Sequence, residues 1–250
     1  MRLLLVNPNM SIAMTAGLAT TARRAASAGT DIVPLTATKG FPYISSMAEA
    51  QVSGVIALEM IAAEAPDADA AIIAAFGDPG LKAARELFDF PIVGMAEAAV
   101  MTANMLGESF AIVTFTPAMA PWYGDLVNST GLGARFVGFR TPDSRTIDLA
   151  KVGAPMRDEL AALARQAALE DGADVVILGG APLAGLAASI QADVPAVVID
   201  PISAAVRLAE ALVCVAPQGA SRGRYRRAPG KASVGLDPTL AAWFAAGGEP

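Results

Sequence analysis

Carboxylates and phenols are the side chains with which this sequence could move a proton, because it contains no histidine and a single cysteine. Histidine is the usual general base near neutral pH. The candidate bases are Asp78, Glu97 and Asp200, and the candidate proton donors are Tyr43 and Tyr123. Asp78 is the first candidate, yet Asp78 and Asp200 each precede a proline, as a helix-capping carboxylate does. A capping role would lower the pKa of the carboxyl and weaken it as a base.

Polar groups follow several predicted strands, where they could hold a small ligand. The side chains are those of Asn9, Ser11, Thr114 and Thr116, and the backbone N–H groups are those of Phe76, Gly77, Gly180 and Ala181. Unpaired N–H groups at helix starts favour an anion. Such a cradle suits a carboxylate, a ureide or a planar cyclic imide, and it would stabilise an enolate. The alternatives are that the polar side chains satisfy turns and that the tyrosines pack in the core.

The elements that would position these residues alternate along the chain as strand and helix, which predicts βαβ units around a parallel sheet. The expected strands are 2–6, 31–35, 71–74, 92–94, 110–114, 135–138, 175–178 and 196–199, and helical spacing occurs at 48–63, 156–170 and 202–213. The strands are short and apolar throughout, as expected when both faces of a sheet are covered.

An internal repeat divides the sequence into two similar halves. Residues 68–75 align without a gap on residues 173–180, and residues 3–9 align on residues 110–116. We therefore expect an α/β fold of two pseudo-twofold-related parallel-sheet lobes with a cleft between them. The expected domains are 1–100 plus 201–250, and 101–200. Ligands bind beyond the carboxyl ends of parallel strands, so loops 7–11, 75–80, 114–117 and 179–184 should line the cleft, with 40–47 as a wall or lid.

Composition narrows the class of protein. A net charge of −6 argues against a nucleic-acid or membrane-surface partner. One cysteine cannot form an internal disulfide, and the N-terminal apolar run is too short for a signal peptide, so we expect a cytoplasmic protein. No metal or cofactor motif is present, and no cofactor is expected. The cluster Arg222, Arg224, Arg226, Arg227 and Lys231 is interpreted as a solvated tail that docks on an acidic surface or a neighbouring subunit.

Several motifs resemble the Asp/Glu/hydantoin racemase superfamily, and the hydantoin and allantoin racemase branch most of all. They are Asn7-Pro8-Asn9-x-Ser11, Ala75-Phe76-Gly77-Asp78-Pro79-Gly80-Leu81, Val93-Gly94-Met95-Ala96-Glu97-Ala98 and Ile177-Leu178-Gly179-Gly180. The resemblance covers roughly residues 1 to 235. It implies cofactor-independent chemistry in which two cysteines, one on each half, remove and return a proton. It also places Ser45 and Ser46 in a loop that faces the ligand, although a serine without a basic partner is a poor nucleophile.

The sequence departs from the family pattern at both cysteine positions, which are Ala75 and Gly180 here. The remaining thiol, Cys214, is interpreted as a small buried residue of a helix far from these loops. The two-thiol mechanism is therefore excluded. We expect Ala75 and Gly180 to face one cavity, so Ala75→Cys with Gly180→Cys should introduce or raise hydantoin racemisation.

Three functional hypotheses remain open. The first is an isomerase that acts on a small carboxylate, hydantoin-like or ureide substrate, with Asp78 as the acid/base group. The second is a lyase or decarboxylase that stabilises an enediolate. The third is a catalytically silent ligand-binding protein. In each case a small molecule is the partner, without nucleic acid or membrane, and we expect a homo-oligomer.

Overall fold

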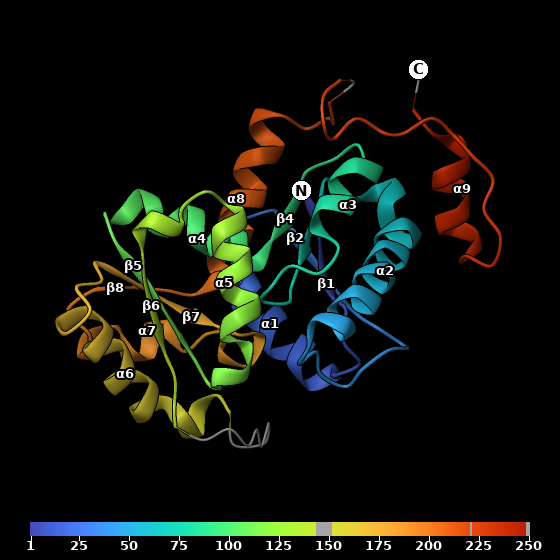
Figure 1. The fold of residues 1–250 in the computed structure, drawn as a ribbon. Helices are drawn as coiled ribbons and strands as arrows, with labels where there is room; N and C mark the ends of the chain where they lie inside the picture. Colours follow the sequence, from blue (N-terminus) through green and yellow to red (C-terminus); the bar gives the residue numbers. More distant parts are fainter. Residues whose placement is uncertain (144–151, 221, 249–250) are drawn as a thin grey trace.

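The computed structural model describes residues 1–143, 152–220 and 222–248 and contains two four-stranded parallel sheets (Figure 1). The strand orders are β2-β1-β3-β4 and β6-β5-β7-β8, so the second half of the chain repeats the topology of the first. The strands are β1 (Arg2–Asn7), β2 (Asp31–Thr36), β3 (Ala70–Ile73), β4 (Ile92–Gly94), β5 (Phe110–Thr114), β6 (Phe136–Arg140), β7 (Val175–Gly179) and β8 (Val197–Ile199). The predicted α/β fold is confirmed, with every expected strand present and shifted by two residues at most.

Strand pairing supports the sequence repeat residue by residue. Leu3 of β1 pairs with Ala70 of β3, and Phe110 of β5 pairs with Val175 of β7. The gap-free alignments of the sequence place Leu3 on Phe110 and Ala70 on Val175. The repeat therefore preserves both the order of the strands and their register.

Helices cover both faces of each sheet, so successive residues of a strand belong to different hydrophobic cores. The helices are α1 (Ile12–Ala25), α2 (Met47–Glu64), α3 (Leu81–Leu87), α4 (Met95–Leu106), α5 (Ala120–Ser129), α6 (Arg157–Leu169), α7 (Ala187–Ile190), α8 (Pro201–Val215) and α9 (Pro238–Ala246). A central core between the sheets joins Leu5 and Ile72 of one sheet to Ile112 and Ile177 of the other through α4 and α8. Separate outer cores lie under α2 and α3 and under α6.

Serine and aspartate side chains cap the N-termini of several helices. Ser11 starts α1, Ser46 starts α2 and Asp200 starts α8, each accepting a hydrogen bond from a backbone N–H in the first turn. The cap predicted for Asp200 is confirmed. α8 then packs on α1 and α4, so the chain returns to the first half after β8.

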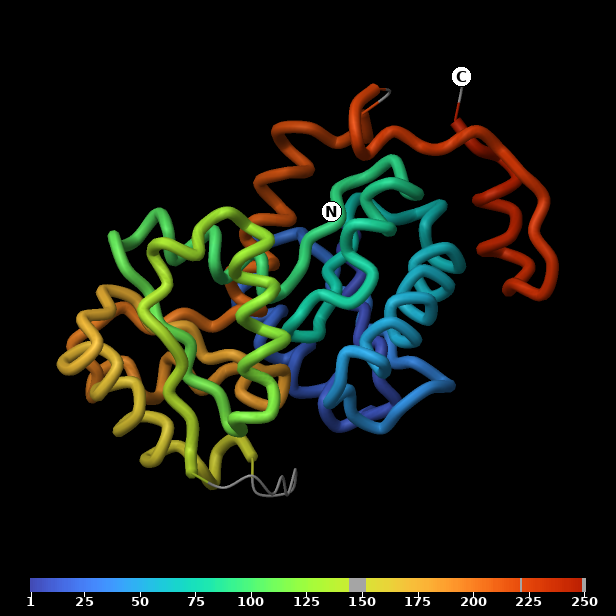
Figure 2. The backbone as a smooth tube through the Cα atoms, viewed as in Figure 1, coloured from blue at the N-terminus to red at the C-terminus, as the bar shows by residue number. Residues whose placement is uncertain are grey.

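The C-terminal segment docks on the first half of the molecule (Figure 2), where α9 packs on α2. Arg227 forms an ion pair with Asp89, and its guanidinium carbon lies 4.7 Å from the ring centroid of Trp243. Docking on an acidic side chain thus holds for Arg227, whereas the other four cations of the predicted tail are exposed. None of the helices in the described part of the chain is long and apolar enough to cross a membrane.

Candidate active site

A small cavity lies between the two halves, where loops beyond the strand ends meet. Asn9, Met14, Tyr43, Ile44, Ala75, Phe76, Trp122, Tyr123 and Ala181 line it. Its volume is about 20 Å³, which is room for about one water molecule. The structure therefore brings together six of the predicted site residues: Asn9, Tyr43, Ala75, Phe76, Tyr123 and Ala181. Ile44 belongs to the loop 40–47 that was expected as a wall or lid. Met14 and Trp122 are lining residues that sequence reasoning missed, because large apolar side chains give no signal of a polar site.

Asn9 is the polar side chain that α1 and β1 position at this cavity. Its Oδ1 accepts hydrogen bonds from Asn7 Nδ2 at 3.0 Å and from Ser11 N at 2.9 Å. Its Nδ2 donates to the thioether sulfur of Met14 at 3.3 Å, and sulfur is a weak acceptor. The two hydrogen bonds to Oδ1 fix the orientation of the amide. Because the sulfur of Met14 is a weak acceptor, Nδ2 would form a stronger hydrogen bond with an oxygen of a ligand.

Three of the serine and threonine candidates, Ser11, Ser46 and Thr116, serve as caps, and the hydroxyl of Ser45 donates to the Glu49 carboxylate at 2.9 Å. The hydroxyl oxygen of Ser11 accepts from Met14 N at 3.2 Å, and that of Ser46 accepts from Glu49 N at 3.2 Å. Thr116 accepts from Ala118 N at 3.3 Å in the turn before α5. None of these three side chains lines the cavity in the part of the chain that the structure describes.

Thr114, at the end of β5, differs from these caps. The residue is fully buried, and its Oγ1 has no hydrogen-bond partner within the described ranges. A buried polar atom without a partner costs free energy and calls for an explanation. Thr114 itself lines neither the small cavity nor the larger groove described below.

The two positions that correspond to the expected cysteines differ in geometry. Ala75 lines the cavity. On the opposite side Gly180 does not line it, and the next residue, Ala181, does. Gly180 has a φ of +136°, and a Cβ added there would lie 2.6 Å from Cε1 of Phe115. The ring of Phe115 therefore occupies the space toward which a side chain at position 180 would point.

Aromatic rings close the cavity on several sides. Phe76 and Tyr123 meet edge to face with centroids 4.7 Å apart, and Tyr43 and Phe115 lie 6.2 Å apart. Tyr43 brings the loop 40–47 into the wall, the role expected from the sequence. Burial raises the pKa of Tyr43 and of Tyr123 well above the ordinary value, so both phenols stay protonated near neutral pH and can act as proton donors but not as bases.

A larger groove lies on the other side of Trp122, between α2 and α5. Its volume is about 390 Å³, and Gly77, Asp78, Glu97 and Asp125 contribute to its lining. Trp122 lines both this groove and the small cavity. Gly77 has a φ of +117°, and a Cβ on it would overlap the indole of Trp122. The indole is thus the partition between a space that fits one water and a space that fits a small molecule.

Asp78 does not cap its own helix, contrary to the expectation from Asp78-Pro79. Its φ is +50°, and α3 begins three residues later after Gly80. Its two carboxylate oxygens instead accept from Ala96 N at 2.9 Å and from Glu97 N at 2.8 Å, at the start of α4. Sequence reasoning missed this cap because the partners lie far along the chain and meet only where β3 and β4 end side by side.

The pKa of Asp78 is raised to about 7, mainly by burial, so the expectation of a lowered pKa is wrong. The N–H donors of Ala96 and Glu97 and the charge of Arg85 lower it, and the charge of Glu97 raises it, but burial outweighs the net effect. Arg85 and Glu97 form a two-bonded ion pair beside it, with Nη1 to Oε1 at 3.0 Å. Glu97 is therefore held by an arginine, and Asp78 is the carboxyl whose pKa suits proton transfer near neutral pH.

Two further candidates are placed away from the cavity. Asp200 accepts from Ser203 N at 2.9 Å and also from Gly185 N, so both of its oxygens serve the backbone. Cys214 is exposed near the end of α8, and its interpretation as a buried residue is wrong. The last turn of α8 extends past the core that buries the start of the helix.

Comparisons with known proteins agree with this fold. The family model described as Asp/Glu/Hydantoin racemase matches residues 3–209. The hydantoin racemase of Pseudomonas sp. (strain NS671) is 35% identical over 237 residues, which cover 94% of this chain and 95% of the relative. The hydantoin racemase of Paenarthrobacter aurescens is 34% identical, over 91% of this chain and 97% of its own. The structure of allantoin racemase from Klebsiella pneumoniae superposes with a TM-score of 0.89 at 32% identity, over 96% and 98% of the two chains.

The chain belongs to the Asp/Glu/hydantoin racemase family, because the matching model covers most of its length. Its homology to racemases classes it as an isomerase whose substrates are small molecules. The family resemblance noted in the sequence is confirmed.

Proposed function

We propose that the protein is a cofactor-independent isomerase that inverts a stereocentre of a hydantoin-like or ureide substrate, or of a small carboxylate, without thiols. The observation that carries this proposal is the cavity to which loops of both halves contribute, inside a fold shared with racemases. A substrate held between two halves can exchange a proton on each of its faces.

Binding requires more room than the small cavity offers. Outward rotation of Trp122 would join it to the groove of about 390 Å³, a volume in the range of small-molecule sites. The amide nitrogen of Asn9 would then donate to a substrate oxygen.

The proton transfers would come from opposite sides of the joined space. Asp78, which lines the groove, removes the proton from the stereocentre, and the electron pair of the broken C–H bond moves onto the adjacent carbonyl as an enolate. Tyr123, which lines the cavity, donates a proton to the other face. The proton on Asp78 then returns through water to the phenolate, which restores both groups.

The test is incubation in deuterated water with 5-substituted hydantoins, allantoin, amino acids and substituted malonates, followed by NMR and chiral chromatography. We expect deuterium at the stereocentre together with loss of optical purity. Asp78→Asn should abolish exchange. Tyr123→Phe should slow racemisation more than exchange, because a substrate deprotonated by Asp78 would be reprotonated mainly on its original face. Release of carbon dioxide would instead establish the lyase alternative and overturn the proposal.

A catalytically silent ligand-binding protein is the second candidate. It is favoured by the lining of the small cavity, in which the described residues offer neither a thiol nor a carboxylate. Its signature would be a saturable rise in melting temperature with one of these compounds but no exchange and no carbon dioxide.

A further inference from the structure

A second cleft lies beneath the C-terminal segment, outside the candidate active site. α2, α3, α9 and residues 224–231 enclose it, and its volume is about 340 Å³. Its apolar walls are Leu58, Leu87, Trp243 and Phe244. An apolar pocket of this size with a few polar groups is typical of sites for small molecules.

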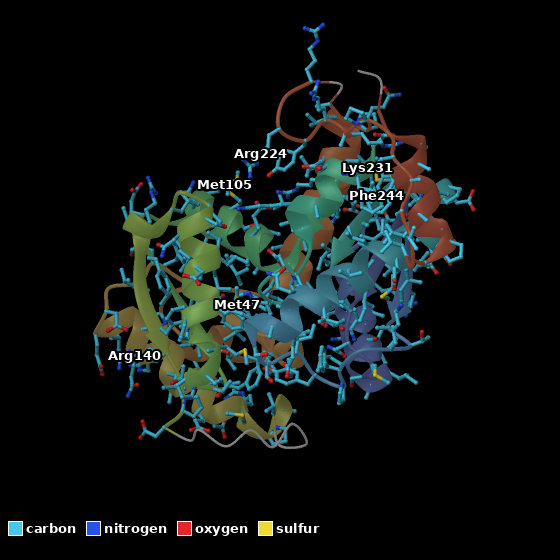
Figure 3. The ribbon with its side chains drawn as sticks, turned by 45° about the vertical axis from the view of Figure 1, so that its right-hand side comes forward. Met47, Met105, Arg140, Arg224, Lys231 and Phe244 are labelled. Atoms are coloured by element: carbon cyan, nitrogen blue, oxygen red, sulfur yellow. The ribbon has the colours of Figure 1, made fainter. Side chains whose placement is uncertain are left out.

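Cationic side chains surround these apolar walls. They are Lys82, Arg224, Arg227 and Lys231, and Glu86 is the acidic residue of the lining. The excess of positive charge is local, because the whole chain carries −6. Lys82, Arg224 and Lys231 form no ion pair with any residue in the described ranges. Figure 3 shows Arg224, Lys231 and Phe244 on the side of the molecule that carries the C-terminal segment.

Arg227 has a different role from the other three cations. It pairs with Asp89 and stacks on the indole of Trp243, which in turn meets Phe88 edge to face at 5.0 Å. Its Nε is buried without a hydrogen-bond partner in the described part of the chain. Arg227 therefore fixes the position of Trp243, which forms one wall of the cleft. The positive charges that can face a ligand are those of Lys82, Arg224 and Lys231.

We propose that this cleft binds a small planar organic anion. The ring of the ligand would lie against Trp243 and Phe244, and its carboxylate would face Lys82, Arg224 and Lys231. Aromatic walls with a cationic rim match a molecule whose two ends differ in this way. A nucleic acid fits less well, because the cleft has a volume of only about 340 Å³ and the chain as a whole carries a net charge of −6. The cleft contains none of the groups assigned to proton transfer, so this proposal can be tested independently of the proposed function.

The experiment is titration of the full chain with 2-naphthoate, followed by calorimetry and by tryptophan emission. We expect saturable binding with one site and quenching of emission. The quenching should persist in Trp122→Phe and disappear in Trp243→Phe, because the sequence has only these two tryptophans. The neutral isostere 2-naphthylmethanol should bind more weakly.

Substitutions of charged residues distinguish binding in this cleft from nonspecific binding to positive charge on the surface. Lys82→Gln, Arg224→Gln and Lys231→Gln should each weaken binding by about two- to fivefold, the range of exposed charge pairs. Arg226→Gln is the matched control, because Arg226 is exposed on the same segment but does not line the cleft. Absence of saturable binding, equal affinity for the alcohol, or equal losses in Arg226→Gln and Arg224→Gln would each overturn the proposal.

Discussion

Asp78 combines two properties that rarely coincide in one carboxyl group. Its oxygens accept hydrogen bonds from the first turn of α4, which favours the charged form, yet burial raises its pKa to about 7. The same residue thus holds a helix start in place and titrates in the physiological range. Both properties arise from its position between β3 and α4.

This residue makes stability depend on pH. Because the pKa is raised in the folded state, the folded protein binds the proton more tightly, and the free energy of unfolding should fall as pH rises from about 4 to about 7. The loss is at most roughly 4 kcal/mol, at about 1.4 kcal/mol per pKa unit. Urea unfolding across this range should show the decrease, and Asp78→Asn should flatten it. Asp125→Asn, an exposed carboxylate of the same groove, should leave the slope unchanged.

Position 180 leaves little room for a side chain, because the ring of Phe115 lies beside it. Gly180→Cys should lower the free energy of unfolding by roughly 1–3 kcal/mol, because of its positive φ and the contact with Phe115. Phe115→Leu should recover part of this loss and should be needed before Ala75→Cys with Gly180→Cys can racemise a hydantoin. Ala75→Cys alone is the control, since Ala75 already has a Cβ at the cavity. Wild-type stability of Gly180→Cys would contradict this account.

The starts of several helices hold the loops around the site. Ser11, Ser46 and Asp200 all cap helices whose preceding loops lie near strand ends. Asp200 also binds Gly185 N, which ties the loop after β7 to α8. The caps therefore connect the conformation of the loops to the helices of the central core.

The two aspartate caps should differ in their effect on stability. Asp200→Ala should lower the free energy of unfolding by about 1–2 kcal/mol, because α8 belongs to the central core. Asp237→Ala removes the cap of α9, which lies at the edge of the molecule. There we expect faster hydrogen exchange in α9 with little change in the urea midpoint. Equal midpoint shifts in the two variants would contradict this assignment.

Helices α4 and α8 form the layer that joins the two sheets. The small side chains of this layer, such as Ala205 and Ala209, are fully buried and allow close packing. A shared core of this kind couples the two halves, so they should unfold together. The domain limits at 100 and 201 remain predictions.

Overpacking this layer tests the coupling. Ala205→Leu should lower the free energy of unfolding by about 1–3 kcal/mol. The transition should remain single when followed by tryptophan emission and by circular dichroism. Ala211→Leu, on the exposed side of the same helix, should change stability by less than about 0.5 kcal/mol. Two separate transitions in Ala205→Leu would show that the halves are independent.

The repeated α/β fold, the strands to within two residues and the lack of histidine at any site could all be predicted from the sequence, because periodicity and composition are local properties of the chain. The repeat also aligned Leu3 with Phe110 and Ala70 with Val175, and the structure gives the two halves equivalent pairings, Leu3 with Ala70 and Phe110 with Val175.

The tertiary structure alone decided what lies opposite each loop. It placed Asp78 against α4, put Phe115 in the space beside Gly180, and made Trp122 the partition between cavity and groove. It also reversed the expected direction of the pKa shift of Asp78. These outcomes depend on contacts between residues far apart in the chain and on how deeply they bury each other, which no local pattern records.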